Sequence, residues 1–207
     1  MSKAIKVILF DLGNVLVDFD YSIAVKRIAH FCGGSPKDIP GLFLGSNLTG
    51  LFEGGKILPE EFFSRMRNML NLNISYERFV PIWNEVFFLS GKNRSVYSLA
   101  NNLRDNYKIA MLSNINILHY EYLKEHFPVF DIFHEVFVSY KMGMVKPDLS
   151  IYSKVLEALG VVPEEVFYTD DKEELVKSAR ALKINSFVFK DIKKLKGDLT
   201  GLGIALN

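Results

Sequence analysis

The sequence of 207 residues contains one cysteine, Cys32, and no long apolar run. A single cysteine excludes a disulfide framework and a cysteine-rich metal site. No apolar stretch approaches the roughly 18 residues that a membrane span needs. The N-terminus, Met-Ser-Lys-Ala-Ile-Lys, leads into a short apolar segment rather than the core of a signal peptide. We therefore expect a cytoplasmic protein with no membrane partner.

The sequence also lacks an excess of charge of either sign. It has 25 Lys and Arg against 24 Asp and Glu, which gives a formal net charge of +1. Proteins that bind nucleic acid usually gather a basic excess on one face. The one basic cluster, Lys193, Lys194 and Lys196, is more typical of a solvated helix face, so we expect no nucleic-acid partner. What the sequence does have is apolar residues, at 49% of the total, enough for a sizeable core.

Apolar runs separated by helical segments predict the fold. Residues 7–10 are all apolar, which is typical of a strand buried on both faces of a parallel sheet. Further short runs predict strands over 109–112, 136–139, 166–169 and 187–189, each preceded by a helical pattern. This alternation indicates an α/β fold: a Rossmann-like parallel sheet of about five or six strands with helices on both faces.

The segment after the first strand has a different character. Apolar residues recur there at helical spacing, and no second buried strand is predicted. Phe79, Trp83 and Phe87 stand four residues apart, as in the core of a helical bundle. We therefore expect a small α-helical cap domain over residues 18–91, inserted into a catalytic core of residues 1–17 and 92–207.

A polar stretch inside this helical segment has two interpretations. Phe-Glu-Gly-Gly at residues 52–55 is either a flexible loop that reaches over the site or a simple helix connector. On the first interpretation Glu53 contacts the substrate, and opening of the cap admits it. Glu53 is therefore a candidate substrate-binding residue.

Polar side chains follow several predicted strands at the point where each ends. In chain order they are Asp11, Ser113, Asn114, Lys146, Asp170 and Asp171. The carboxyl ends of parallel strands share one edge of a sheet, where ligands of open α/β sheets bind. Clustered carboxylates repel one another unless positive charge lies among them. Lys146 supplies one such charge, and Mg²⁺, which prefers oxygen ligands, is the expected cofactor.

Such a site is equipped to transfer a phosphoryl group. Mg²⁺ and Lys146 would neutralise the phosphoryl oxygens, and Ser113 and the Asn114 amide would donate hydrogen bonds to them. Asp11 would attack in line and form an aspartyl-phosphate.

Four segments resemble, in order, the motifs of the haloacid dehalogenase-like superfamily of hydrolases. They are Phe-Asp-Leu-Gly-Asn-Val at residues 10–15, Leu-Ser-Asn at 112–114, Gly-Met-Val-Lys-Pro-Asp at 143–148 and Tyr-Thr-Asp-Asp at 168–171. The resemblance implies a Rossmann-like core with a helical cap between the first and second motifs. The first motif is most similar to that of small phosphatases that act on sugar phosphates such as glucose 1-phosphate.

The resemblance also implies a role for each strand-end residue. Asp11 would be the nucleophile, and Ser113 and Asn114 would bind the phosphoryl group. Lys146 would steady that group together with Asp11. The metal ligands implied by the resemblance are Asp11, the main-chain carbonyl of Gly13, and Asp170, with Asp171 close by.

The first motif departs from most phosphatases of the family at Gly13. Most members carry an Asp there, which protonates the leaving group and later activates water. Loss of such acid–base help costs on the order of 10²–10⁴ in rate. The loss matters least when the leaving oxygen is already stable, as in a sugar 1-phosphate. Asp18, Asp20 and Glu53 are the candidate substitutes.

The leading hypothesis is a Mg²⁺-dependent phosphatase of a small phosphorylated metabolite, such as a sugar 1-phosphate, with an aspartyl-phosphate on Asp11. One alternative is a 2-haloacid dehalogenase, in which Asp11 is the nucleophile and no metal is needed. Another is a non-catalytic member of the family that uses the cap as a binding surface. The sequence leaves open whether the chain is a monomer or a homodimer, and whether the Lys146–Pro147 bond is cis or trans.

Overall fold

A five-stranded parallel sheet lies at the centre of the computed structural model, which describes residues 3–33 and 47–206. The strand order is β5-β4-β1-β6-β7, and every neighbouring pair is parallel. The strands are β1 (Val7–Phe10), β4 (Lys108–Ser113), β5 (Glu135–Val138), β6 (Val166–Asp170) and β7 (Asn185–Val188). This arrangement confirms the predicted parallel α/β sheet.

Strand register brings the predicted site residues to one edge of the sheet. Phe10, the last residue of β1, aligns with Met111 of β4 and with Thr169 of β6. Asp11 and Asp170 therefore lie at the same level on neighbouring strands, and β4 ends close by at Ser113.

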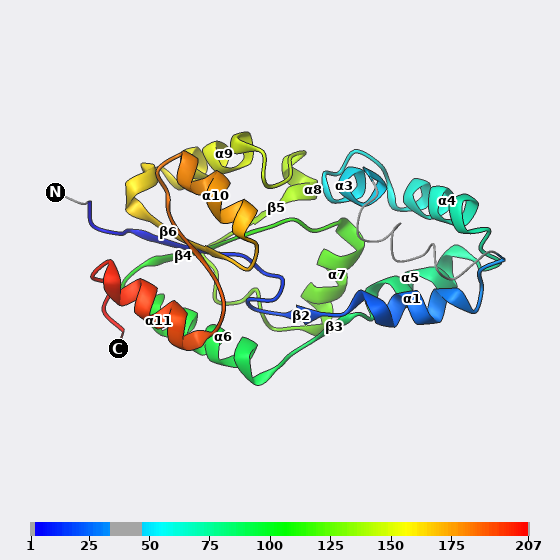
Figure 1. The fold of residues 1–207 in the computed structure, drawn as a ribbon, viewed down its shortest axis with the longest axis horizontal. Helices are drawn as coiled ribbons and strands as arrows, with labels where there is room; N and C mark the ends of the chain where they lie inside the picture. Colours follow the sequence, from blue (N-terminus) through cyan, green and yellow to red (C-terminus); the bar gives the residue numbers. More distant parts are fainter. Residues whose placement is uncertain (1–2, 34–46, 207) are drawn as a thin grey trace.

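Helices cover both faces of the sheet, as the sequence predicts. In Figure 1, α9 (Leu149–Leu159) and α10 (Glu173–Ala181) lie on one side, and α6 (Gly91–Leu103) and α11 (Ile192–Gly201) lie on the other. The central strand, β1, packs against the helices on both faces of the sheet, because its side chains point alternately to each face. Val7 and Leu9 pack with α9, whereas Ile8 and Phe10 pack with α6 and α11. The remaining core helices are α7 (Ile117–His126), α8 (Ser139–Met142) and the 3₁₀ helix η2 (Pro163–Glu165).

A second group of helices lies at the end of the molecule away from α11 (Figure 1). It comprises α1 (Tyr21–Ala29), α3 (Asn47–Glu53), α4 (Pro59–Leu70) and α5 (Tyr76–Asn84). Its centre is aromatic: Phe62, Phe79 and Trp83 are fully buried, and the rings of Phe79 and Trp83 stack at 5.9 Å. Residues 34–46 of the predicted cap lie outside the described residues. The cap boundaries at 18 and 91 stay a prediction.

One part of this region differs from the sequence-based expectation. A short antiparallel ribbon joins β2 (Asp18–Phe19) to β3 (Phe87–Phe88), where no strand is predicted. Phe87 therefore belongs to a strand, because α5 ends at Asn84, and it does not continue the helical stripe of Phe79 and Trp83. Two-residue strands have too few positions to show a period in the sequence, so this ribbon is detectable only from its long-range pairing.

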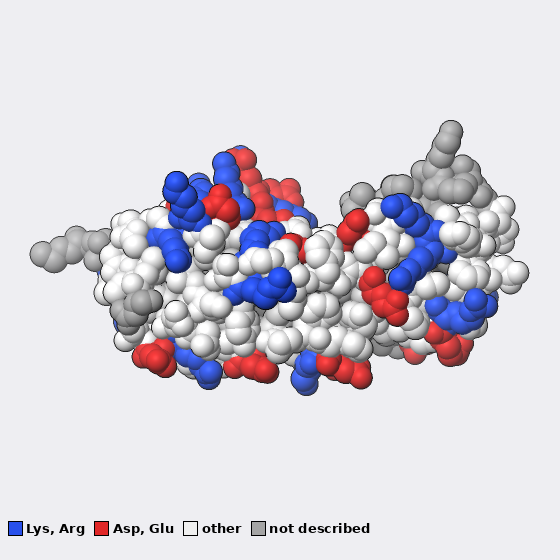
Figure 2. Space-filling view, turned by 90° about the horizontal axis from the view of Figure 1, so that it is seen from below, with Lys and Arg blue, Asp and Glu red and all other residues white. Residues whose placement is uncertain are grey.

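Surface charge agrees with the balanced composition. Figure 2 shows Lys and Arg interspersed with Asp and Glu on the visible face, and the surface dips between its two ends. None of the described helices is long and apolar enough to cross a membrane.

Candidate active site

Lys146 joins the two carboxylates at the centre of the site. Its Nζ donates hydrogen bonds to Asp11 Oδ1 at 2.8 Å and to Asp170 Oδ2 at 2.7 Å. All three side chains are buried, with relative exposures of 3% for Lys146, 7% for Asp11 and 0% for Asp170. The predicted convergence of strand-end groups is therefore present, and the buried cation offsets the repulsion between the two acids.

Further contacts fix the position of Lys146. Its Nζ also donates to the Leu112 carbonyl at 3.1 Å and to the Tyr168 hydroxyl at 3.2 Å, and that hydroxyl in turn donates to Asp170 Oδ2. The side chain of Asn114 holds the Lys146 backbone: its Nδ2 donates to the Lys146 carbonyl at 2.8 Å, and the Lys146 N–H donates to its Oδ1 at 2.8 Å. The Lys146–Pro147 peptide bond is cis. Because the Asn114 side chain is engaged in this way, a contact from Asn114 to a phosphoryl group falls to its backbone N–H.

Burial and charge shift the pKa values of this cluster in different directions. Burial raises the pKa of Asp11 to about 7, although the nearby Lys146 ammonium opposes the shift. Burial also disfavours charge on Asp170 and Lys146, but their mutual attraction outweighs it. The pKa of Asp170 is therefore below its usual value, and the pKa of Lys146 is well above its usual value. Lys146 consequently remains an ammonium at neutral pH.

Three carboxylates form a group that fits a divalent cation. Asp11, Asp170 and Asp171 each offer an oxygen, and these oxygens lie within 4.8 Å of one another. Of the adjacent Asp170 and Asp171, Asp170 has more hydrogen bonds within the protein. Its Oδ2 accepts from Lys146 and Tyr168, and its Oδ1 accepts from the Lys172 N–H at 2.9 Å. Asp171 is half-buried and lines the cavity. Mg²⁺ takes carboxylate and carbonyl oxygens as ligands, so this donor set suits it.

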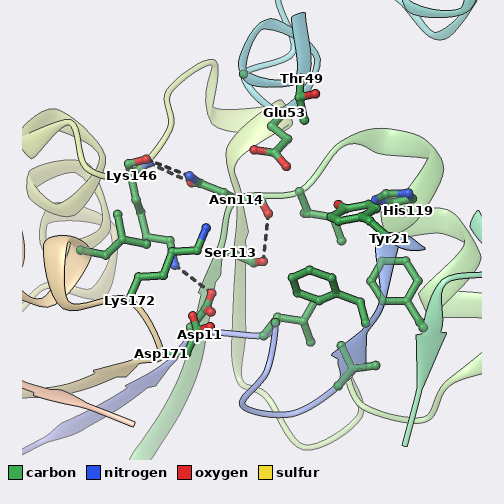
Figure 3. A pocket seen from close by; sticks show the side chains of 18 residues that line it. Asp11, Tyr21, Thr49, Glu53, Ser113, Asn114, His119, Lys146, Asp171 and Lys172 are labelled. Atoms are coloured by element: carbon green, nitrogen blue, oxygen red, sulfur yellow. Dashed lines mark hydrogen bonds and ion pairs between the residues drawn. The ribbon is translucent and has the colours of Figure 1, made fainter. Parts of the chain in front are cut away.

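A cavity of about 410 Å³ opens between the sheet edge and the helices of the second group. Figure 3 shows Asp11, Asp171, Lys146 and Lys172 on one side of it, with Ser113 and Asn114 near its centre. Seven of the site residues predicted from sequence line this cavity, whereas Asp170 and the candidate acids Asp18 and Asp20 do not; the lining ones are Asp11, Gly13, Glu53, Ser113, Asn114, Lys146 and Asp171.

Glu53 reaches this cavity from the side of α3, although not on a loop. It is the last residue of α3, and its neighbour Phe52 is buried and stacks on Phe62 with ring centroids 4.4 Å apart. Of the two interpretations of residues 52–55, the flexible loop does not hold for the first two, because Phe52 and Glu53 end α3 and the turn begins at Gly54. The side chain points into the cavity (Figure 3), and burial raises its pKa to about 7.

Aromatic side chains form a second wall of the cavity that sequence reasoning did not find. Phe19, Tyr21, Phe87 and His119 line it. His119 is buried with both ring nitrogens engaged, Nδ1 with the Asn116 side chain at 3.1 Å and Nε2 with the Trp83 carbonyl at 3.1 Å. These residues come from β2, α1, β3 and α7, so no local spacing in the sequence connects them.

Two polar residues were also missed. Asn14 has φ +57° and donates from Nδ2 to Asp171 Oδ2 at 2.9 Å. Lys172 lines the cavity beside Asp171. Their signals are weak: Asn14 follows Gly13 and is typical of a turn, and Lys172 is one of many exposed lysines in the sequence.

Comparison with known proteins finds a family model and relatives that match most of this chain. A family model described as haloacid dehalogenase-like hydrolase matches residues 5–183. A D-ribitol-5-phosphate phosphatase of Bacteroides thetaiotaomicron is 27% identical over 192 residues, covering 88% of this chain and 91% of that protein. A sesquiterpene phosphatase of Aspergillus oryzae is also 27% identical, over 88% of each chain.

Solved structures show the same fold. A haloacid dehalogenase-family enzyme of Bacteroides thetaiotaomicron, crystallised with magnesium and inorganic phosphate, superposes with a TM-score of 0.80 at 29% identity, covering 91% of this chain and 96% of that one. An L-2-haloacid dehalogenase superposes with a TM-score of 0.63 at 19% identity, over 88% of this chain and 83% of that one, which is a likeness of fold alone. The chain belongs to the haloacid dehalogenase-like family, and it is a hydrolase.

Proposed function

We propose that this hydrolase is a Mg²⁺-dependent phosphatase of a small phosphorylated metabolite, and that Asp11 is its nucleophile. The observation that carries the proposal is the buried arrangement of Lys146 between Asp11 and Asp170, with Asp171 at the cavity wall. One oxygen of Asp11 is fixed by Lys146, so the carboxylate is oriented at the cavity floor before any substrate arrives.

Each residue has a role in the proposed site. Asp11, the Gly13 carbonyl, Asp170 and Asp171 would hold Mg²⁺, with Asp171 the freer of the two adjacent acids. When bound, Mg²⁺ would neutralise phosphoryl oxygens and keep Asp11 ionised. The Ser113 hydroxyl, the Asn114 N–H and Lys146 would bind the phosphoryl group, and the Ser113 hydroxyl is suitably placed because it lines the cavity.

The reaction has two chemical steps. In the first, an oxygen of Asp11 bonds to phosphorus as the ester P–O bond breaks, and the leaving alkoxide takes up a proton. In the second, water attacks phosphorus, the bond to Asp11 breaks, and inorganic phosphate leaves with Asp11 restored. Lys146 keeps its charge throughout, because two carboxylates surround it.

The cavity supports a substrate with both polar and apolar surface. Glu53 offers a hydrogen-bond acceptor for hydroxyl groups, and Phe19, Tyr21 and Phe87 offer a flat apolar wall. Both features suit a sugar ring, whose faces are apolar and whose edge carries hydroxyls. A sugar 1-phosphate such as glucose 1-phosphate is therefore the first substrate to test.

The helices over residues 18–91 act, in this proposal, as a cap over a catalytic core of residues 1–17 and 92–207. They supply Glu53, Thr49 and Tyr21 to the cavity, whereas the core supplies the phosphoryl site. The cap would therefore determine which organic group fits.

A 2-haloacid dehalogenase is less well supported by this site. Such a reaction needs no cation, yet three carboxylate oxygens lie within 4.8 Å of one another here. A non-catalytic role is less well supported because buried, mutually paired charges with shifted pKa values that line a cavity are typical of active sites.

Release of inorganic phosphate from a panel of sugar phosphates, measured with Mg²⁺ and with EDTA, tests the proposal. We expect turnover with Mg²⁺ that EDTA abolishes. Asp11→Asn should lower the rate by at least about 10⁴-fold, because it removes the nucleophile. Phosphate release that survives in Asp11→Asn, or release of chloride from 2-chloropropionate in the presence of EDTA, would contradict it.

A further inference from the structure

Departure of an alkoxide in the first step requires a proton donor, and the carboxylates and Lys146 at the centre of this site have other roles. Asp11 is the nucleophile, and Asp170 and Lys146 are committed to one another. Asp171 accepts from Asn14 and belongs to the group that suits Mg²⁺. The donor must therefore come from another part of the cavity wall.

The position of Gly13 is closed to an acid by packing. A Cβ at residue 13 would lie 2.9 Å from Cε1 of Phe19, closer than side chains normally approach. Phe19 is held in place between the rings of Tyr21 and Phe87, with centroid distances of 5.1 and 6.2 Å. The aromatic wall therefore occupies the space that a side chain at residue 13 would need.

Other candidate acids have different tasks. Asp18 accepts from Lys92 at 2.7 Å and from Asn93 at 3.1 Å, and Asp20 caps α1 by accepting from the Ser22 N–H at 2.8 Å. Neither lines the cavity. His119 has both ring nitrogens engaged, and burial lowers its pKa to about 4, so at neutral pH it is an uncharged imidazole and not an acid for the leaving group.

Glu53 meets the requirements that these groups fail. It lines the cavity, its carboxyl group points inward from α3 (Figure 3), and within residues 3–33 and 47–206 no hydrogen bond to that group is present. Its backbone is fixed to the core, because the buried Ser139 hydroxyl lies 2.6 Å from the Glu53 carbonyl and donates to it. The following turn also touches the core, since a Cβ at Gly55 would lie 2.2 Å from the Tyr140 carbonyl oxygen.

The charges that face Glu53 leave it able to exchange a proton. Lys172 and Lys146 favour its ionised form, Asp11 disfavours it, and Tyr21 lies close enough for its own pKa to be raised by Glu53. Burial outweighs these effects and raises the pKa of Glu53 to about 7. A group with this pKa is present in both protonation states near neutral pH, as acid–base catalysis requires.

Resting on the proposed phosphatase activity, the geometry points to Glu53 as the general acid and base of the reaction, supplied by α3 in place of the core. In the first step the Glu53 carboxylic acid gives its proton to the leaving oxygen as the ester P–O bond breaks. In the second step the Glu53 carboxylate takes a proton from the attacking water as the bond from phosphorus to Asp11 breaks. The acid and Asp11 are thus regenerated together. This acid would extend the substrate range to alkyl phosphates, whose leaving groups need protonation.

The test compares two substrates by kcat/KM, which reports the first step. One is an alkyl ester such as glucose 6-phosphate, and the other is 4-nitrophenyl phosphate, whose leaving group departs without a proton. Glu53→Gln should lower kcat/KM for the alkyl ester by about 10²–10⁴-fold and for 4-nitrophenyl phosphate by less than about threefold. For the alkyl ester, kcat/KM of the wild type should fall at alkaline pH, and this fall should disappear in Glu53→Gln. Glu53→Asp should retain part of the activity.

Two further variants separate the possible outcomes. Glu60→Gln, at an exposed glutamate of α4, is the matched control and should leave both substrates unaffected. Lys172→Met tests the neighbouring cation, and a loss selective for the alkyl ester in that variant would overturn the assignment. The assignment of Glu53 would also be overturned if Glu53→Gln lowered kcat/KM equally for both substrates, or for neither. Failure of the wild-type protein to hydrolyse these two substrates and every member of the sugar-phosphate panel would instead contradict the proposed phosphatase.

Discussion

Two regions of the molecule hold the residues of the proposed site by different forces: the carboxyl edge of the sheet, and the second group of helices, which here are called the capping helices (α1, α3, α4 and α5). At the sheet edge, Lys146, Asp11 and Asp170 are buried and bound to one another by charge-assisted hydrogen bonds. In the capping helices, apolar packing of Phe52 on Phe62 positions the adjacent Glu53, whose carboxyl group carries no such partner within the described residues. The difference suits their proposed tasks, because a nucleophile must be held in one orientation whereas a proton donor must be able to lose and regain its proton.

Breaking the charge network should have the largest effect. Lys146→Met leaves two buried carboxylates without their cation, so we expect a loss of about 3–5 kcal/mol in the free energy of unfolding together with loss of turnover. Chemical denaturation and phosphate release measure the two effects. Lys177→Met is the control, because the exposed pair of Lys177 with Glu173 should contribute less than about 1 kcal/mol. If both variants lost a comparable amount of unfolding free energy, the buried ion pair would contribute no more to stability than an exposed one.

Breaking the apolar packing should spare the nucleophile. Phe62 is fully buried between Phe52 and Trp83, so Phe62→Ala should lower the free energy of unfolding by about 3–5 kcal/mol. At a temperature where the variant remains folded, 4-nitrophenyl phosphate should still be hydrolysed, whereas alkyl phosphates should be hydrolysed more slowly because Glu53 is displaced. A parallel loss on both substrates would show that the two regions are not independent.

The junction between the two regions can be weakened on its own. Ser139→Ala removes the hydroxyl that donates to the Glu53 carbonyl and accepts from the Ile115 N–H at 2.9 Å. We expect a loss of about 1–3 kcal/mol in the free energy of unfolding, because buried polar groups lose their partner. Kinetics should show a fall for alkyl phosphates. Ser95→Ala serves as the control, since the exposed Ser95 hydroxyl donates to the Gly91 carbonyl within its own helical turn. An equal effect of this variant would argue against a junction at Ser139.

A smaller effect concerns pH. Burial lowers the pKa of His119 from 6.5 to about 4, so between these pH values the unfolded chain binds more protons than the folded one. Stability should therefore fall as pH falls through this window, by at most about 3 kcal/mol from this group. His119→Gln should reduce that slope relative to the wild type in denaturation curves measured from pH 4 to 7. An unchanged slope would mean that His119 titrates normally.

The core of the site could be predicted from sequence because its information is local. Apolar runs that end at Asp11 and Asp170 mark buried strands, and the shared edge of a parallel sheet brings their ends together. In a parallel sheet the strand ends are aligned, so the groups that follow them meet at one edge. The sequence therefore predicted that Lys146 lies among the acids without knowledge of any particular long-range contact.

The parts of the fold and the site that the sequence did not predict depend on contacts between distant segments of the chain. The ribbon of β2 and β3, the aromatic wall and the hydrogen bond of Ser139 to Glu53 each join residues far apart in the chain, and the sequence carries no spacing that marks them. The side chain of Asn114 illustrates the same limit, since its partner is the backbone of Lys146. The assignment of ligands, nucleophile and domain boundaries stays a prediction.

The most direct measurement is to trap the intermediate on Asp11. The enzyme is mixed with substrate and Mg²⁺, quenched and reduced with borohydride, which converts an aspartyl-phosphate into homoserine, and then digested for mass spectrometry. We expect homoserine at residue 11 only when substrate is present, and none in Asp11→Asn. Turnover with an unmodified residue 11, or reduction at another carboxylate, would contradict the account.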